Sequence, residues 1–541
     1  MSFRRAGAWT RRALLVCVVC VTAVGAAVSS ATSSVPPAAP AAATGAHDWP
    51  AWTYDLAGSR FAAGETELTP ATVGNLRLKW AFAYPRAGLA KSQPAVVGGI
   101  AYFGSPDGKL HAVNATTGAT VWTFDVDTVS PGVGNTAVWD GPTVADGKVI
   151  FGDHRGYLYA LAQRTGALLW ATHVDTHPFA AFTGSPLYYH GKVYIGMSSE
   201  ESGQGIDYPC CTFRGQLAAV DGSTGAVVWR YRTVPPASEV GSWPNGQPMY
   251  APSGGPVWGT PAIDRDTNTV YFGTGQNYTG VGPDHNQPAG DIDSIIALNT
   301  SNGAVRWKRQ LAEADTYRVA CSRGDPGYCP GLLNGSALDY DVSPGPNVFT
   351  VGSRRLVGVG QKNGVYHVFD AATGATVWER TLGVPAPGGP GGIQWGTSYD
   401  GQRLYIATWQ ANPGTLFAID PATGATMWSA PNPPDGCSTG GAAQFPGYCQ
   451  LALTPAVTTS PGVVYEGSWD GKMRAFSADT GAVLWEYDTF RHFAGVNGIT
   501  GTGSAVSGNG GAVVSNGMVF VQSGYYPYPV DAGYVLLAFG L

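Results

Sequence analysis

The chain has 541 residues, of which 76 are Gly and 39 are Pro, and this share of turn-forming residues excludes a coiled coil or a helical bundle. Apolar residues make up 44% and charged residues 13%, about half the usual charged fraction, so the chain can bury a large core and is not disordered. The formal net charge of -6 provides no basic surface for a nucleic-acid backbone, and we expect no nucleic-acid partner.

The N-terminal residues 1–28 have the pattern of a secretion signal, because four Arg residues precede an apolar run over residues 13–28. This run is shorter than the roughly 20 residues that span a bilayer, and no second run follows it, so we expect no stable membrane span. Residues 29–47 are typical of an Ala/Pro/Ser linker, and residues 48–541 form the predicted folded domain. The pattern predicts a protein that is secreted or resides in the cell envelope, with general secretion and twin-arginine export both open.

Export changes the interpretation of the cysteines, since Cys17 and Cys20 lie in the signal and six remain after it. Six cysteines allow fifteen connectivities, and a zinc site is an alternative to disulfides. The simplest framework pairs cysteines that are close in sequence, namely Cys210 with Cys211, Cys321 with Cys329 and Cys437 with Cys449.

A nine-residue motif that ends in Trp recurs along the chain, with a Gly four residues before the Trp, as in NATTGATVW and DAATGATVW. Its spacing is too wide for a small helical repeat and suits one four-stranded sheet plus loops. The motif Trp residues are at positions 122, 170, 229, 307, 378, 428 and 485.

A strand similar to KLHAV precedes every Trp motif, and an eighth such strand, YVLLAF at residues 534–539, has no Trp strand after it. Conversely, the first Trp strand, LRLKWAF with Trp80, has no such strand before it. The two ends therefore complete one another. The sequence predicts an all-β fold, an eight-bladed β-propeller closed by pairing of its N- and C-terminal strands, which removes the free sheet edges.

The repeat resembles that of the quinoprotein alcohol dehydrogenases, most of all the polyvinyl alcohol dehydrogenase branch. The resemblance implies a secreted eight-bladed propeller that holds pyrroloquinoline quinone (PQQ) and a metal ion on its axis. Non-catalytic propellers that scaffold the cell envelope share the Trp repeat and are the alternative. The segments that favour the enzyme are CCTFRG (210–215), VWGTPAIDRDTNTVYFGTGQN (257–277), GQKNGVYHVFD (360–370), GGIQWG (391–396) and VLLAF (535–539).

The resemblance implies a quinone site with two flat faces. A disulfide between adjacent Cys210 and Cys211 covers one face in the family, with pairing to distant cysteines as the alternative, and the Trp258 indole stacks on the other, with core packing as the alternative. The other implied contacts are Thr183, which hydrogen-bonds the quinone, Arg214, which meets its carboxylates, Lys362, which lies beside its ortho-quinone oxygens, and Gln394 and Trp395, where the family has Asn-Trp.

The implied metal is a hard cation with oxygen ligands, Ca²⁺ or a lanthanide. The resemblance gives Glu201 as one ligand, with Glu200 as the alternative, and Asn277 and Asp339 as further ligands. An ordinary acidic pair on the surface is the alternative interpretation of the two Glu residues.

The family base is an Asp in a Trp-Asp-Tyr-like segment that accepts the alcohol proton. Asp339 in Ala-Leu-Asp-Tyr-Asp is the predicted base, Asp341 is the runner-up, and Asp315 in Glu-Ala-Asp-Thr-Tyr is the next candidate. The segment between the two motifs carries Cys321 and Cys329, and we interpret it as a disulfide-bonded insertion that splits the family motif.

These features predict a PQQ-dependent dehydrogenase that transfers hydride from an alcohol, such as the secondary alcohols of polyvinyl alcohol, to a metal-bound quinone. A covalent haem c requires Cys-x-x-Cys-His, and the one Cys-x-x-Cys sequence ends at Cys20 and is followed by Val21. We therefore expect no haem, and a separate electron acceptor such as a cytochrome or a quinone.

Overall fold

The computed structural model describes residues 45–541, except 86–87, 130–135, 314, 326, 331–337, 343, 385–390, 410–412, 507–508, 526–527 and 531–532. Every described residue belongs to one compact unit, Ala41–Leu541. The predicted signal (1–28) and nearly all of the predicted linker (29–47) lie outside the described residues.

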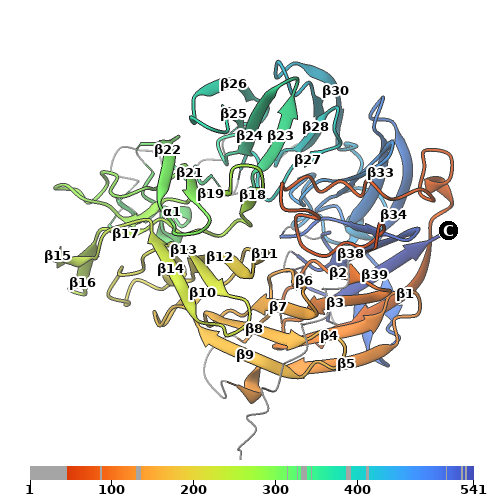
Figure 1. Cartoon of the computed structure of the whole chain (residues 1–541), viewed down its shortest axis with the longest axis horizontal. Helices are drawn as coiled ribbons and strands as arrows, with labels where there is room; N and C mark the ends of the chain where they lie inside the picture. The colour runs from red at the N-terminus through yellow and green to blue at the C-terminus, as the bar shows by residue number, and fades with distance from the viewer. Residues whose placement is uncertain are drawn as a thin grey trace, which may run out of the picture. The chain divides into compact units, whose positions relative to one another are not determined.

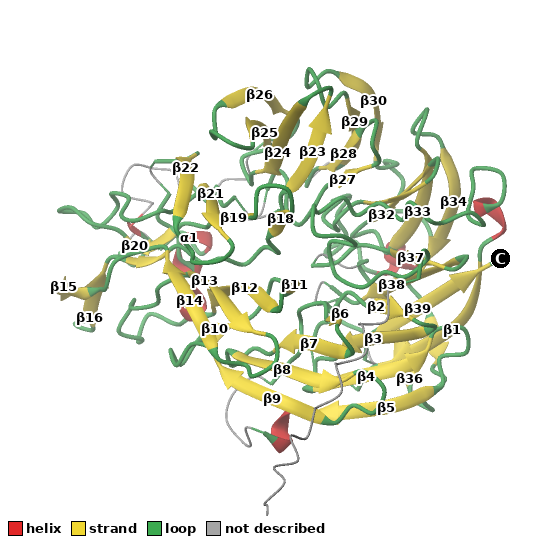
Figure 2. Cartoon of the chain, in the orientation of Figure 1, coloured by secondary structure: helices red, strands yellow, loops and turns green. Residues whose placement is uncertain are grey.

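The described residues form eight antiparallel sheets with almost no helix (Figures 1 and 2), which confirms the predicted eight-bladed propeller. Each sheet is built from four strands, and β10 (Ala180–Ala181) adds to the third. From the innermost strand outward, the first four sheets are β2 (Ala95–Val97), β3 (Ile100–Gly104), β4 (Lys109–Asn114), β5 (Thr120–Asp125); β6 (Thr143–Ala145), β7 (Lys148–Gly152), β8 (Tyr157–Ala162), β9 (Leu168–His173); β11 (Leu187–Tyr189), β12 (Lys192–Ser199), β13 (Gln216–Asp221), β14 (Val227–Arg232); and β18 (Ala262–Asp264), β19 (Thr269–Gly273), β21 (Ser294–Asn299), β22 (Val305–Gln310).

The other four sheets repeat the same order of strands, and the eighth is completed by the first strand of the chain. They are β23 (Asn347–Val351), β24 (Arg354–Gly360), β25 (Val365–Asp370), β26 (Thr376–Thr381); β27 (Ser398–Tyr399), β28 (Leu404–Ala407), β29 (Thr415–Ile419), β30 (Thr426–Pro431); β31 (Thr458–Ser460), β32 (Val463–Gly467), β33 (Lys472–Ser477), β34 (Val483–Asp488); and β37 (Val513–Ser515), β38 (Met518–Ser523), β39 (Val535–Gly540), β1 (Arg77–Ala83).

The innermost strands form a ring. β2 contacts β6, and β6 contacts β11. The strands β18, β23, β27, β31 and β37 contact one another in that order, and β37 meets β2 again. Between the third and fourth sheets, the Ser185 backbone N, just before β11, donates to Thr260 Oγ1, just before β18. In the eighth sheet β1 pairs antiparallel with β39, and Trp80 lies opposite Ala538. The first and last strands of the described unit therefore share one sheet, in which β39 lies between β38 and the outermost strand β1.

Each motif Trp joins its sheet to the next one around the ring. The indole lies on the outermost strand, and its Nε1 donates a hydrogen bond to a backbone carbonyl of the neighbouring sheet or of the segment leading to it. The acceptors are Ala115 for Trp80, Gln163 for Trp122, Gly222 for Trp170, Thr300 for Trp229, Ala371 for Trp307, Pro421 for Trp378, Ala478 for Trp428 and Leu76 for Trp485.

The motif Gly is required because the preceding Trp packs against it. All seven motif glycines have positive φ, and a Cβ at any of them would come within 2.6–2.9 Å of the ring of the Trp in the preceding sheet. The motif therefore encodes a contact between sheets, in which a turn of one repeat receives the indole of another.

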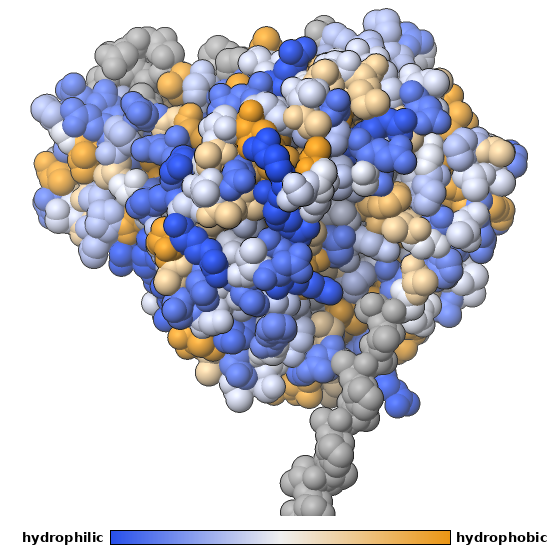
Figure 3. Space-filling model, turned by 45° about the horizontal axis from the view of Figure 1, so that its top comes forward, coloured by the Kyte–Doolittle hydropathy of each residue, from blue (hydrophilic) through white to orange (hydrophobic). Residues whose placement is uncertain are grey.

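Seven of the fifteen exposed large apolar side chains of the described residues lie on outermost strands. Val121, Leu169, Val228 and Met427 each precede a motif Trp and are about half exposed, because successive strand residues point to opposite faces. Hydrophobic and hydrophilic residues are interspersed on the face shown in Figure 3, which agrees with the low charge content.

Two kinds of connection emerge on one face of the ring, because neighbouring strands in each sheet are antiparallel. These are the segments from an outermost strand to the next innermost strand, and the turns between the second and third strands of a sheet. They carry the short helix α1 (Val319–Ser322), the 3-10 turn η3 (Glu201–Gly203), and the ribbons β15 (Ser238–Ser242) with β16 (Pro248–Ala251), β17 (Ser253–Gly254) with β20 (Asn277–Thr279), and β35 (His492–Ala494) with β36 (Thr500–Thr502).

The three local disulfides predicted from sequence are all present. Cys321 to Cys329 and Cys437 to Cys449 close loops with Cα separations of 4.9 and 5.6 Å, within the ordinary range. Among the helices of the described residues, none has the length and apolar composition needed to cross a membrane.

We expect Gly424→Ala to destabilise the propeller more than Gly352→Ala. Both glycines have positive φ, which costs any other residue about 1–2 kcal/mol. A Cβ at Gly424 would also lie 2.7 Å from the Trp378 ring, whereas one at Gly352 meets no atom within 4 Å. The extra cost of overpacking is about 1–3 kcal/mol, and urea denaturation of both variants measures it. Equal shifts of the midpoint would contradict the role given to the Trp and Gly contact.

Candidate active site

Four predicted or neighbouring site residues occupy the same position in successive sheets. Lys91, Trp139, Thr183 and Trp258 each lie three residues before the Pro that leads into an innermost strand. This position is on the face where the outer-to-inner connections emerge, next to the axis. The repeat therefore delivers one side chain per sheet to the same part of the molecule.

Lys362 lies in the turn between β24 and β25 and pairs with two carboxylates. Its Nζ is 2.7 Å from Asp339 Oδ1 and 2.6 Å from Asp341 Oδ2, and all three side chains are largely buried. Burial alone would lower the pKa of Lys362, but the two negative charges outweigh it and raise that pKa. Lys362 is therefore a permanent ammonium at this site.

The two carboxylates are held differently. Asp341 also accepts a hydrogen bond from the Gln276 backbone N at 2.9 Å and one from Trp258 Nε1 at 3.0 Å. Asp339 has Lys362 as its one hydrogen-bond donor among the described residues. Burial raises the pKa of Asp339 to about 6 even though Lys362 opposes it. Asp339 is thus the carboxylate with room to take up a proton, and Asp341 is held in place.

An aromatic wall adjoins this triad. The Trp258 and Trp395 rings meet edge to face with centroids 4.8 Å apart, and Lys362 Nζ lies 5.0 Å from the Trp258 ring centroid. Thr183 Oγ1 donates to the Trp258 carbonyl at 3.3 Å. The structure therefore brings together Thr183, Trp258, Trp395 and Lys362 with both Asp residues of the predicted base segment.

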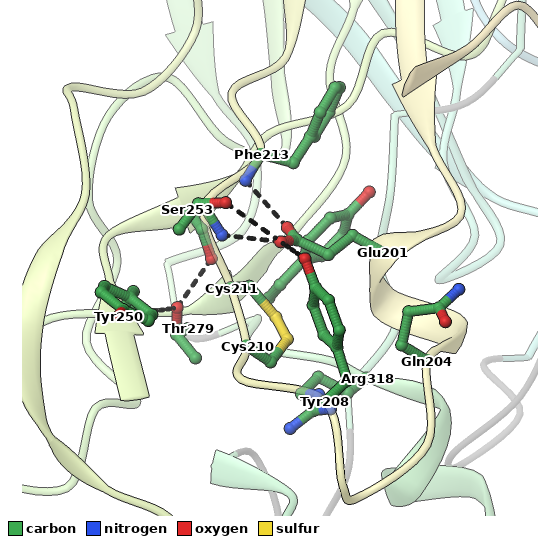
Figure 4. The surroundings of a disulfide bond; sticks show 12 residues. Glu201, Gln204, Tyr208, Cys210, Cys211, Phe213, Tyr250, Ser253, Thr279 and Arg318 are labelled. Carbon is green, nitrogen blue, oxygen red and sulfur yellow. Dashed lines mark hydrogen bonds between the residues drawn. A yellow bond between two sulfur atoms is a disulfide. The ribbon is translucent and has the colours of Figure 1, made fainter. Parts of the chain in front are cut away.

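Cys210 and Cys211 form a disulfide between adjacent residues in the connection between β12 and β13, and both are fully buried. Figure 4 shows Glu201 beside this pair. Glu201 Oε1 accepts hydrogen bonds from Tyr208 and from Thr212, and Oε2 accepts one from the Phe213 backbone N at 2.8 Å. Glu201 thereby fixes the chain on both sides of the cysteines.

The electrostatics of Glu201 agree with this clamping role. Burial alone would raise the pKa of Glu201, but His177 at 3.3 Å and the backbone N–H groups of Thr212 and Phe213 outweigh it, so the pKa is lowered. Glu200 lies nearby with half of its side chain exposed, and its Oε1 is 3.8 Å from His154 Nδ1.

The other predicted contacts are engaged with the backbone. Arg214 Nε donates to the Val234 carbonyl at 2.9 Å, and Gln394 Nε2 donates to the Gly391 carbonyl at 2.6 Å. Asn277 Nδ2 donates to the Ser253 and Ala289 carbonyls, and its Oδ1 accepts from the Ala289 backbone N at 2.9 Å. Asn277 therefore joins loops, and none of these three side chains contacts Lys362 within the described part of the chain.

Two further carboxylates, of Asp293 and Asp315, lie next to Asp341. Oxygen atoms of Asp293, Asp315 and Asp341 lie within 4.8 Å of one another, and all three residues are buried. Among the described residues, neither oxygen of Asp293 has a hydrogen-bond partner, and Asp315 Oδ1 has none either. Burial, reinforced by the neighbouring carboxylates, raises the pKa of Asp293 and of Asp315 well above the usual range. Such a group binds either protons or a cation.

Sequence reasoning did not single out Asp293, Lys91 or Trp139. Asp293 stands alone before strand β21, and its proximity to Asp315 and Asp341, which both lie between β22 and β23, depends on two connections that only folding brings together. Lys91 and Trp139 could have been found by aligning the repeats on the Pro before each innermost strand, which places both in register with Thr183 and Trp258.

Comparison with known families places the chain among quinone-dependent propellers. Residues 49–319 match the family model named PQQ, which describes the beta-propeller domain of glucose, ethanol and alcohol dehydrogenases. Residues 341–526 match the model for outer membrane protein assembly factor BamB. The polyvinylalcohol dehydrogenase of Sphingopyxis sp. (strain 113P3) is 33% identical over 459 residues, which cover 82% of this chain and 67% of that protein. A polyvinylalcohol dehydrogenase of Pseudomonas sp. is 32% identical over 452 residues, with the same coverage.

Solved structures agree on the fold. The quinohemoprotein alcohol dehydrogenase ADHIIG of Pseudomonas putida HK5 superposes with a TM-score of 0.66 at 20% identity, covering 92% of this chain and 80% of that one. A europium-containing methanol dehydrogenase gives a TM-score of 0.66 at 18% identity, covering 92% of this chain and 98% of that one.

We expect Lys362→Met to destabilise the metal-free protein by about 3–5 kcal/mol at pH 8, because it leaves two buried carboxylates without their counter-charge. The loss should be smaller at pH 5. Removing the ammonium raises the pKa of Asp339 further above 6, so this carboxyl is protonated at pH 5 and its buried charge disappears. Lys148→Met is the control, since Lys148 pairs with the exposed Asp146 and such pairs contribute about 0–1 kcal/mol. Chemical denaturation at the two pH values measures both variants, and a loss independent of pH would contradict this account.

Proposed function

Since the chain belongs to the PQQ-dependent alcohol dehydrogenase family, we propose that it oxidises the secondary alcohol groups of a polymer such as polyvinyl alcohol. The observation that carries this proposal is the joint presence of Lys362, Asp339 and the Trp258 indole beside the axis. A scaffold needs none of these groups. The alternative, a non-catalytic scaffold or binding propeller of the cell envelope, draws on the BamB model match, which covers residues 341–526.

The residues present fit a planar anionic quinone. The aromatic face of Trp258 suits a flat conjugated ring, and Lys362 places positive charge 5.0 Å from that face, where it stabilises negative charge that develops on the quinone oxygens. Bound PQQ supplies the two-electron acceptor for the hydride of the carbinol carbon. The buried Cys210 and Cys211 pair remains the proposed cover of the second face.

Asp339 is the proposed base. It takes the hydroxyl proton of the alcohol while the carbinol hydrogen leaves as hydride, so the alcohol loses two electrons and two hydrogens and becomes a carbonyl. Asp339 accepts one hydrogen bond from the protein, whereas Asp341 accepts three, and a base needs a free lone pair. Asp341 positions Trp258 and Lys362 through its own bonds.

Ca²⁺ or a lanthanide is the proposed metal. Four buried carboxylates, of Asp293, Asp315, Asp339 and Asp341, face one ammonium, and the unbonded oxygens of Asp293 and Asp315 suit a hard cation. The ligands expected from the family resemblance are Glu201, Asn277 and Asp339. Both Glu201 oxygens and Asn277 Oδ1 accept backbone hydrogen bonds, whereas both Asp293 oxygens and Asp315 Oδ1 have no partner among the described residues, so we favour Asp293 and Asp315, with the adjacent Asp341, as ligands.

We propose that the protein is exported and passes its electrons to a separate acceptor without a haem of its own. The N-terminal pattern of residues 1–28 and the three disulfides support export into an oxidising compartment. A Soret band in the purified protein would overturn the part of the proposal that concerns haem.

Reconstitution tests the function. Purified protein mixed with PQQ and Ca²⁺ should retain the quinone through gel filtration and reduce an artificial dye when polyvinyl alcohol or a small secondary alcohol is added. Quinone retention without activity on any alcohol would favour a binding propeller. If the protein neither retains the quinone nor reduces the dye, the proposal that it is an enzyme is wrong.

Asp339→Asn should lower turnover by roughly 10²–10⁴, because the amide keeps the size and polarity of the side chain but cannot accept the proton. Binding of PQQ should change little. Asp341→Asn is the matched variant, and we expect it to weaken PQQ binding as well, since Trp258 and Lys362 lose a shared partner. Dye reduction against PQQ concentration separates the two effects, and an active Asp339→Asn enzyme would transfer the role to Asp341 or Asp315.

Asp293→Asn should reduce Ca²⁺ affinity without changing the fold, since neither Asp293 oxygen bonds the protein. Calorimetric titration of PQQ-free protein with Ca²⁺ and with La³⁺ measures this, and competition between them identifies the preferred ion. Glu201→Gln is the comparison variant. If Glu201→Gln abolishes binding while Asp293→Asn retains it, the ligand set expected from the family resemblance is correct.

A further inference from the structure

Lys91 lies in the segment between β1 and β2, and no carboxylate of the described residues is within ion-pair distance of its ammonium. Its Nζ is 3.6 Å from the Trp139 ring centroid and 5.7 Å from that of Tyr525. Within the described part of the chain, no hydrogen bond or ion pair reaches it. Lys91 is partly buried, and an ammonium that loses part of its hydration beside aromatic rings is stabilised by an anion or by the π-faces.

Trp139 adds a second donor beside this ammonium. The Trp139 Nε1 atom is buried and has no acceptor in the described structure. A buried N–H without an acceptor is costly, as is an unpaired ammonium, and here the two belong to side chains in contact. One carboxylate has two oxygen atoms and satisfies both donors at once.

The position of Lys91 relates it to the proposed quinone site. In the first sheet it occupies the repeat position that Thr183 and Trp258 hold in the third and fourth. Lys362 belongs to the fifth sheet, across the ring of eight from the first. Lys91 Nζ is 5.7 Å from the Tyr525 ring centroid. Burial raises the pKa of Tyr525, and the positive charge of Lys362 opposes this rise. Tyr525 is therefore close enough to both ammonium groups to interact with them electrostatically.

We propose that Lys91 and the Trp139 indole N–H bind a carboxylate of PQQ at the end of the ring opposite Lys362. This inference rests on the proposed function, because it takes PQQ as the ligand. PQQ is flat, carries three carboxylates, and has its two adjacent carbonyls on one side. Two cations on opposite sheets set the orientation of such a molecule, with the carbonyls toward Lys362 and a carboxylate toward Lys91.

The proton equilibrium of Lys91 is consistent with this role. Burial lowers the pKa of Lys91 to about 8, and the charge of Glu200 opposes that effect. His154, with its pKa lowered by burial to about 3, and Tyr525, with its pKa raised by burial, do not change charge between pH 6.5 and pH 9. Quinone binding to the wild-type protein should therefore weaken as the pH rises from 6.5 to 9, because the ammonium is lost.

Equilibrium dialysis of PQQ against the full protein with Ca²⁺, read by quinone absorbance, tests the proposal. Lys91→Met should weaken binding about 10- to 100-fold at pH 7 and abolish the pH dependence. Trp139→Phe, which keeps the ring and removes the N–H, should weaken binding about 3- to 10-fold. Lys148→Met is the control for net charge, since Lys148 pairs with Asp146 at the start of β7, and binding should not change.

The trimethyl ester of PQQ separates a carboxylate contact from a general effect on the site. It should bind the wild-type protein and Lys91→Met with equal affinity, since the charge that Lys91 recognises is gone. Equal binding of PQQ to wild type and Lys91→Met, or equal losses for PQQ and its ester, would overturn the inference while leaving the proposed function intact. Absence of PQQ binding to the wild-type protein would overturn both. Should Lys91→Met fail to fold, Trp139→Phe carries the same comparison between PQQ and its ester.

Discussion

The contact between the Trp of one sheet and the Gly of the next holds the ring together. Each indole donates to a backbone carbonyl of the next sheet, and seven of them pack on a glycine that has no room for a Cβ. This contact sets the angle between neighbouring sheets, and the angle sets how many close a ring. Closure then brings eight sets of loops around one axis. A side chain from the first sheet can share a site with one from the fifth only because the ring closes.

The centre of that ring is electrically unbalanced. Asp293, Asp315, Asp339 and Asp341 are buried beside a single ammonium, Lys362, and the oxygens of Asp293 have no partner. In the first sheet, Lys91 is an ammonium that forms no ion pair with the described residues and lies against the Trp139 ring. An excess of carboxylates at one end and an unpaired cation at the other is the complement of a metal ion together with an anionic, flat ligand. In the proposed function, the metal ion would neutralise the excess carboxylates, and a carboxylate of PQQ would pair with Lys91.

Parts of the site were accessible from the sequence and parts were not. Trp258, Lys362 and the two Asp residues of the Asp-Tyr-Asp segment were named from the sequence and lie together in the structure, while their roles remain predictions. Glu201 illustrates the limit. Its position in the chain is compatible with a metal ligand, but its oxygens accept hydrogen bonds from Tyr208, Thr212 and Phe213, and it clamps the loop of the cysteine pair. Sequence position does not show whether a carboxylate is already hydrogen bonded.

The sequence by itself determined the number of sheets, the pairing of the first strand with the last sheet, and the three disulfides. These depend on local spacing, which repeats along the chain and is visible without coordinates. Only the tertiary structure decided which carboxylates gather. Asp293 precedes β21, whereas Asp315 and Asp341 both lie in the connection between β22 and β23, and their oxygens meet within 4.8 Å because folding brings the two connections to one place. Which oxygens keep a free lone pair and which charges stay unpaired depends on that packing. The spacing of residues along the chain therefore does not predict them.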